Sequence, residues 1–90
     1  MEFEWDPKKS NANKQKHGIM FEEAATVFAN PLAISFTDPD HSLAEERYLS
    51  FGMSRTRHLL VVSHVDRGGR VRIISARLMT RQERRIYEEG

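Results

Sequence analysis

The sequence of 90 residues contains no cysteine. This absence excludes a disulfide framework, a zinc-thiolate site and a thiol nucleophile, so any chemistry falls to His, Lys, Arg, Tyr or carboxylate side chains. The longest aliphatic run, residues 59–62, is too short to cross a bilayer, and the first residues lack the basic and apolar regions of a signal peptide. We therefore expect one cytoplasmic domain, residues 1–90, without a membrane partner.

Arginine is absent from the first half of the chain, and lysine is absent after residue 16. Residues 1–46 contain four Lys and nine acidic residues, a net charge of −5, whereas residues 47–90 contain ten Arg and four acidic residues, a net charge of +6. Because the guanidinium group binds phosphate with two parallel hydrogen bonds, this distribution predicts a phosphate-binding surface in the second half. A solvated basic face without a ligand would have the same composition.

Hydrophobic periodicity and capping signals predict an α+β domain with the order β-α-α-β-β-β-β-α. The second helix has an apolar face typical of a core helix, and residues 59–65 are apolar enough for a central strand buried on both faces. Thr80 and Glu83 form a capping box that begins the last helix. The expected elements are a strand at residues 2–5, helices at 7–17, 21–28 and from 81 onward, and strands at 32–37, 48–53, 59–65 and 70–77.

The first expected helix has almost no apolar residue except Ala12. Lys9, Asn13 and His17 are spaced by four residues, so they lie on one polar stripe of this helix, with Lys16 beside it. A helix with so poor a packing face is either peripheral or retained for the polar stripe.

The turn at residues 66–69 predicts a hairpin between the last two strands. If the hairpin is symmetric about Arg67 and Gly68, Arg72 and Arg77 point to opposite faces of the sheet. Only a bulge, or a strand end before Arg77, would bring both guanidinium groups to one site, and the sequence leaves this open. The symmetric register pairs Val62 with Ile73, Ser63 with Arg72 and His58 with Arg77.

Several short segments, spread over nearly the whole chain, are informative when their order and spacing are taken together. They are Phe3-Glu-Trp-Asp-Pro, Lys16-His-Gly-Ile, Phe21-Glu-Glu-Ala, Glu46-Arg47, and Arg72-Ile-Ile-Ser-Ala-Arg77 followed by Glu83 and Tyr87. In this order and spacing they strongly resemble the BrnT family of toxins. The one visible departure is Met20, where the family often has a Ser or Thr cap before the second helix.

This resemblance implies a RelE-like fold with a curved antiparallel sheet and helices packed against it. It also implies a ribonuclease activity that halts translation, and a BrnA-type antitoxin partner with a ribbon-helix-helix domain. The toxin would take part in repressing its own operon through the antitoxin complex, so operator DNA would be bound only in that complex.

Metal-free RNA cleavage needs a base for the 2′-hydroxyl, an acid for the leaving 5′-oxygen, and fixed positive charge at the phosphate. With the resemblance, His17 is the expected base or acid and Lys16 could stabilise negative charge, although helix capping by His17 and a solvated Lys16 are the simpler explanations. Arg72 and Arg77 are the expected phosphate-binding residues. Glu46 is either the ion-pair partner of one of these arginines or a catalytic carboxylate. Which residue is the base and which the acid stays open, and no cofactor is expected.

Four further arginines are expected around two hairpin ends, where they would bind the RNA backbone without reading sequence. They are Arg47, Arg55, Arg57 and Arg70. His58 and His64 occupy strand positions, where packing explains them.

Three alternatives accompany this interpretation. Asp38, Asp40 and His41, with Glu45 nearby, could ligate a divalent metal, but turns favour Asp and Pro for backbone reasons alone, so we expect no metal. The basic surface could instead belong to a non-catalytic module that holds an antitoxin and, through it, operator DNA, or to an inactive relative with a structural role.

Overall fold

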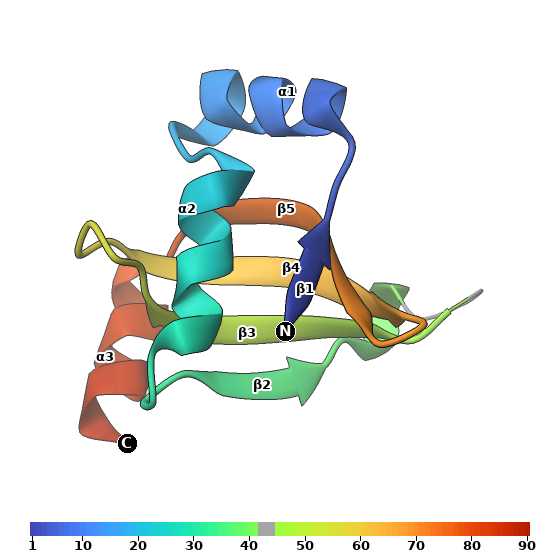
Figure 1. Cartoon of the computed structure of the whole chain (residues 1–90). Helices are drawn as coiled ribbons and strands as arrows, with labels where there is room; N and C mark the ends of the chain where they lie inside the picture. Colours follow the sequence, from blue (N-terminus) through green and yellow to red (C-terminus); the bar gives the residue numbers. More distant parts are fainter. Residues whose placement is uncertain (42–44) are drawn as a thin grey trace.

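The computed structural model describes residues 1–41 and 45–90, which form a five-stranded sheet with helices on both sides (Figure 1). The strand order is β1-β5-β4-β3-β2. Within the described residues, no helix is both long and apolar enough to cross a membrane. The elements are β1 (Glu2–Glu4), α1 (Pro7–His17), α2 (Phe21–Ala25), the 3₁₀ helix η1 (Thr26–Ala29), β2 (Ile34–Thr37), the 3₁₀ helix η2 (Pro39–His41), β3 (Arg47–Met53), β4 (Leu59–Arg67), β5 (Arg70–Leu78) and α3 (Arg81–Glu89).

The expected α+β class and element order are confirmed, and β4 is the central strand. Leu60, Val62 and Val65 of β4 are fully buried, as expected for a strand covered on both faces. The expected sheet was antiparallel, and this is wrong for one edge, because β1 pairs parallel with β5. A parallel neighbour is possible here because α1, α2 and three strands separate β1 from β5 in the chain.

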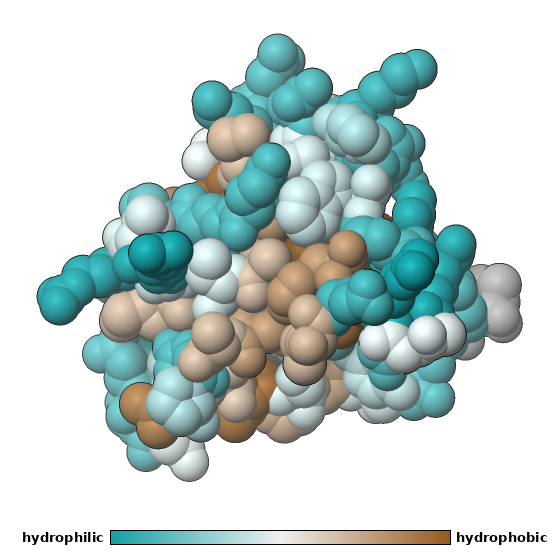
Figure 2. Space-filling view, viewed as in Figure 1, coloured by the Kyte–Doolittle hydropathy of each residue, from teal (hydrophilic) through white to brown (hydrophobic). Residues whose placement is uncertain are grey.

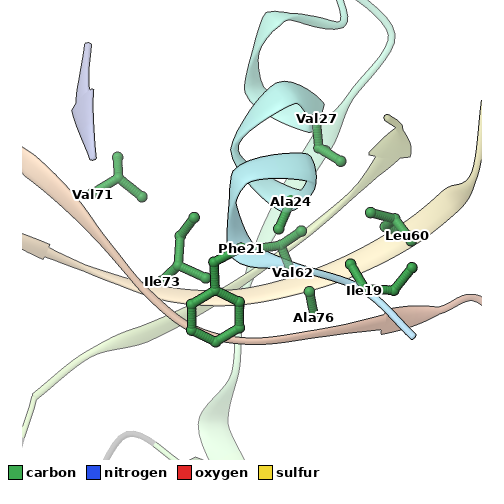
Figure 3. Close-up of a cluster of buried hydrophobic side chains, with 9 residues drawn as sticks. All are labelled: Ile19, Phe21, Ala24, Val27, Leu60, Val62, Val71, Ile73 and Ala76. Carbon is green, nitrogen blue, oxygen red and sulfur yellow. The ribbon is translucent and has the colours of Figure 1, made fainter. Parts of the chain in front are cut away.

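The hydrophobic core lies between the sheet and α2 with η1 (Figure 3). Phe21 and Ala24 are completely buried, as the helical periodicity predicts. Val27 is also completely buried, whereas Phe28 is only partly buried. The reason is that the chain tightens into η1 after Ala25, and a period of three residues places Val27 below Ala24.

Asn13 anchors α1 to the sheet instead of facing solvent. Its side-chain amide donates to the Ala76 carbonyl at 2.8 Å and accepts from the Ala76 N–H at 3.1 Å. It also donates to the Ile19 carbonyl at 2.8 Å. Because β1 covers only residues 70–72 of β5, the edge at Ala76 would otherwise be unpaired, and Asn13 replaces the missing strand. Part of the polar stripe of α1 is therefore structural.

The predicted hairpin register between β4 and β5 is wrong. Val62 pairs with Ala76 and not with Ile73, and Val61, not His58, lies opposite Arg77. The ladder shifts between Ser63 and His64, which pair with Ser75 and Ile73, so Ile74 is an extra residue in β5. Such a bulge cannot be read from the turn sequence, because the symmetric register satisfies the turn equally well.

The last helix, α3, lies on the face of the sheet opposite α2 (Figure 1). It begins at the expected capping box, in which Thr80 and Glu83 each bond the other's backbone N–H. The Tyr87 hydroxyl donates to the Leu32 carbonyl at 3.1 Å. We call the two sides of the sheet the α2 face and the α3 face.

Candidate active site

The bulge in β5 places Arg72 and Arg77 on the same face of the sheet. Ile73 and Ala76 both belong to the core, although they are three residues apart, which a regular strand would not allow. Arg72 precedes the first of these residues and Arg77 follows the second, so both point to the α3 face. The sequence left open whether a bulge brings both guanidinium groups to one side of the sheet, and the structure contains that bulge.

Both arginines are paired with carboxylates. Arg72 Nη1 lies 2.9 Å from Glu4 Oε2, on the neighbouring strand β1. Arg77 forms two hydrogen bonds with Glu83 of α3, at 2.7 and 3.1 Å. A third bond, at 3.3 Å, joins Arg77 to the Leu78 carbonyl. Since a guanidinium has about five N–H donors, Arg77 retains donors for a ligand.

Of the two roles considered for Glu46, the ion pair with Arg72 or Arg77 is wrong, because Glu4 and Glu83 are the partners of these arginines. Glu46 is exposed directly before β3, and its negative charge raises the pKa of Tyr48. Arg77 lies opposite Val61, four residues along β4 from Val65, so it is about 13 Å from the end of the sheet where Glu46 lies. Arg72 is nearer, but Glu4 of the adjacent strand is its partner.

The Arg77–Glu83 pair makes stability depend on pH. The hydrogen bond with Arg77, opposed by burial, lowers the pKa of Glu83 from 4.5 to about 2, and the same pair raises the pKa of Arg77. Because the folded-state pKa of Glu83 is below its unfolded value, the stabilisation is complete above about pH 4.5 and is lost as the pH falls toward 2. The Arg77 side chain is 40% exposed, so after solvent screening we expect about 1–2 kcal/mol.

A groove of about 360 Å³ opens on the α3 face beside Arg77. We call it the Arg77 groove. It brings two guanidinium groups, one imidazole, two carboxylates and two hydroxyls around one space. The lining residues are Asp38, Asp40, His41, Arg47, Leu49, Ser63, Ser75 and Arg77.

His41 is held in this groove by Asp38. The ring Nδ1 is 2.9 Å from Asp38 Oδ2, while the other carboxylate oxygen accepts the Asp40 N–H at 3.3 Å. The side chain of Asp38 is 12% exposed and that of His41 is 64% exposed. An ionised carboxylate favours the tautomer with the proton on Nδ1, which leaves Nε2 as an exposed proton acceptor. This arrangement suits a general base.

Sequence reasoning considered His41 only as a metal ligand and gave Ser63 and Ser75 no role. The available signal was the spacing of Asp38 and His41, since a 3₁₀ turn over Pro39 places residues three apart on one side. Across residues 1–41 and 45–90, no three potential metal ligands cluster. Glu45, the fourth residue considered for a metal, pairs with Arg67 at 3.2 Å.

Lys16 and His17 lie at the end of α1, away from the contacts just described. Lys16 is exposed and His17 is half-buried. Within the described residues, neither side chain has a hydrogen bond or an ion pair. The Lys14 carbonyl near the end of α1 is capped by the Gly18 N–H, not by His17. The described contacts therefore do not join these two residues to the Arg77 groove.

The four additional arginines separate into two groups. Arg47 lines the Arg77 groove, and Arg70 lies 3.8 Å from Glu4 near the same end of the sheet. Arg55 and Arg57 lie at the opposite end, in the turn between β3 and β4. The four arginines therefore lie at two ends of the hairpins, as the sequence predicts.

The sequence and the fold of the chain match known proteins. Residues 5–83 match the model of a family described as ribonuclease toxin, BrnT, of type II toxin-antitoxin systems. Among solved structures, the chain is similar to the 1.1 Å crystal structure of the ribonuclease toxin BrnT from Brucella abortus, with a TM-score of 0.68 and 24% identity over 90% of this chain and 99% of that one. At this identity the likeness concerns the fold. No curated protein matches the chain.

Proposed function

The chain belongs to the BrnT family of ribonuclease toxins of type II toxin-antitoxin systems, and from this premise we propose that it cleaves RNA in the Arg77 groove without a metal ion. The observation that supports this proposal is the meeting of the Asp38–His41 pair with Arg77 in one groove. An exposed base beside a guanidinium supplies two of the three functions that attack by a 2′-hydroxyl on the adjacent phosphate requires, and water can supply the third, the acid.

In the proposed reaction, His41 Nε2 takes the proton of the 2′-hydroxyl, and the 2′-oxygen forms a bond to phosphorus. The bond from phosphorus to the 5′-oxygen breaks, and water in the open groove protonates that oxygen. Arg77 stabilises the charge on the phosphate through its remaining N–H donors. Arg47 holds the RNA on the other side of the groove. The products are a 2′,3′-cyclic phosphate and a 5′-hydroxyl.

The other expected site residues receive supporting roles in this proposal. Arg72, paired with Glu4 on the same face, places positive charge beside the groove. Lys16 and His17 contribute positive charge or hydrogen bonds along the RNA path at the edge of β5, without transferring a proton. Glu46 does not line the groove, and we assign it no part in the reaction.

A type II toxin-antitoxin family implies a protein antitoxin as partner. We propose that this partner is a BrnA-type antitoxin with a ribbon-helix-helix domain, and that the complex binds operator DNA and represses its operon. The resemblance of the chain to the family supports this proposal. The site of action would be the cytoplasm, where mRNA is translated.

Expression of this chain alone is expected to arrest growth, because loss of mRNA stops protein synthesis. Incorporation of labelled methionine should fall within minutes of induction, and co-expression of the antitoxin should restore it. The His41→Gln chain, expressed at the same soluble level, is the matched control and should permit growth. Normal growth of cells that contain abundant soluble unmodified chain would show that the chain is not toxic and would contradict the proposed function.

The non-catalytic binding module is favoured by one observation. Glu83 already occupies two donors of Arg77, as it would in a purely structural ion pair. The two functions differ in the products: the module leaves RNA intact, whereas the ribonuclease shortens it. Gel analysis of RNA incubated with the purified chain therefore separates them.

A further inference from the structure

A second pocket, lined by basic and apolar side chains, lies outside the Arg77 groove, where the turn between β3 and β4 meets α3. Its volume is about 390 Å³, and we call it the turn pocket. Figure 2 shows hydrophilic side chains projecting from this end of the molecule, at the left. Within the described chain, neither Arg57 nor Arg84 of this pocket has a carboxylate partner. The lining residues are Arg57, His58, Leu59, Leu78, Met79 and Arg84.

Glu23 of α2 fixes the turn that carries Arg57. One oxygen of this carboxylate accepts hydrogen bonds from Ser54 Oγ, Thr56 Oγ1 and His58 Nδ1, each at 2.6 Å. Burial opposes ionisation, but these bonds lower the pKa of Glu23. His58, expected to be packed, is instead 51% exposed at the pocket. The turn is thus held in place before any ligand binds, which reduces the entropy lost on binding.

Arg57 adopts a backbone conformation that glycine would adopt at less cost. Its φ of 69° makes it the one described non-glycine residue with a positive φ. The turn closes through a hydrogen bond from the Arg57 N–H to the Ser54 carbonyl at 3.0 Å. A left-handed conformation costs an L-residue about 1–2 kcal/mol. Backbone strain of this kind clusters at ligand-binding positions, and here it is retained by an arginine at the rim of a pocket.

We propose that the turn pocket binds a second phosphate of the RNA chain that is cleaved in the Arg77 groove. This inference rests on the proposed ribonuclease function. The pocket lies just beyond Arg77 along the chain, because Leu78 follows Arg77 on β5 and Arg84 follows Glu83, the partner of Arg77, although Leu78 points to the opposite face of the sheet from Arg77. The side chains of Leu59, Leu78 and Met79 place apolar surface beside Arg57 and Arg84, and ionic hydrogen bonds to a phosphate are screened less beside apolar surface than in open water.

The test is equilibrium binding of a labelled 2′-O-methyl RNA oligonucleotide, which has no 2′-hydroxyl to react, at a series of salt concentrations. Arg57→Gly and Arg84→Gln should each weaken binding by about fivefold to tenfold and reduce the slope of log affinity against log salt by about 0.7, the value for one lost phosphate contact. Arg57→Gly should keep a near-normal unfolding midpoint, because glycine accepts this φ. Arg85→Gln, with the same charge change on the same helix but outside the pocket, should bind like the unmodified chain.

Unchanged affinity and salt slope in both variants would overturn the proposed phosphate site. If the unmodified chain still cleaves ordinary RNA in that case, only the turn pocket is wrong and the ribonuclease proposal stands. If the unmodified chain neither binds nor cleaves RNA, both proposals fail. Normal RNA binding with lost antitoxin binding would assign the pocket to carboxylates of the antitoxin and would also overturn the inference.

Discussion

Replacement of His41 by glutamine is expected to reduce the rate of RNA cleavage by at least about a hundredfold, the usual contribution of a positioned base. Glutamine retains a polar side chain near Asp38 but cannot accept the proton of the 2′-hydroxyl. The side chain is 64% exposed, so the unfolding midpoint should hardly change. Single-turnover cleavage of a defined RNA, with thermal unfolding of the same samples, measures both quantities.

His17→Gln is the matched control, because it makes the same substitution at the imidazole that the sequence alone favours. We expect it to slow cleavage by less than about tenfold, since His17 has no described contact with the Arg77 groove. A large loss in His17→Gln together with normal cleavage by His41→Gln would reverse the assignment. The active site would then lie at the edge of β5 beside α1.

Replacement of Arg77 by glutamine is expected to reduce cleavage by about a hundredfold or more, the scale of losing one preorganised donor to the transition state. The substitution also leaves Glu83 without its guanidinium partner, so the free energy of unfolding at pH 7 should fall by about 1–2 kcal/mol. In the unmodified chain, the free energy of unfolding should rise as the pH increases from about 2 to 4.5. This rise should be smaller in Arg77→Gln, because the low pKa of Glu83 depends on Arg77.

Glu83→Gln separates the two roles of Arg77, because it breaks the same ion pair and keeps the guanidinium. Glutamine still completes a capping box with Thr80, so α3 should retain its first turn. We expect a similar loss of stability but cleavage within about tenfold of normal. Equal losses of cleavage in both variants, in step with their stabilities, would mean that Arg77 acts only through the fold.

Local signals in the sequence were sufficient for most elements of the fold. The capping box at Thr80, the apolar face of α2 and the apolar run of β4 each depend on near neighbours, and each is found in the structure. The resemblance of short segments to the BrnT family gave the fold and the kind of activity, both of which the family match supports.

The site depended on contacts between distant residues, which periodicity does not encode. The bulge at Ile74 decides that Arg72 and Arg77 share a face, yet it leaves no mark on the turn before it. Glu4, the partner of Arg72, is 68 residues away in the chain, on a parallel edge strand that could not be placed beside β5 from the sequence. Glu83 is only six residues from Arg77, but the direction in which α3 leaves β5 decides whether the two side chains meet. Asn13 was placed on the polar stripe of the first helix, but its hydrogen bond to Ala76 joins residues 63 apart and could not be predicted.

Cleavage of RNA by the purified chain in excess EDTA, followed by analysis of the new ends, tests the central claim most directly. The proposed reaction predicts undiminished cleavage and products that end in a 2′,3′-cyclic phosphate and a 5′-hydroxyl, because the 2′-oxygen is the nucleophile and no metal-bound water takes part. Products with a 5′-phosphate, or activity abolished by EDTA and restored by a divalent cation, would contradict it.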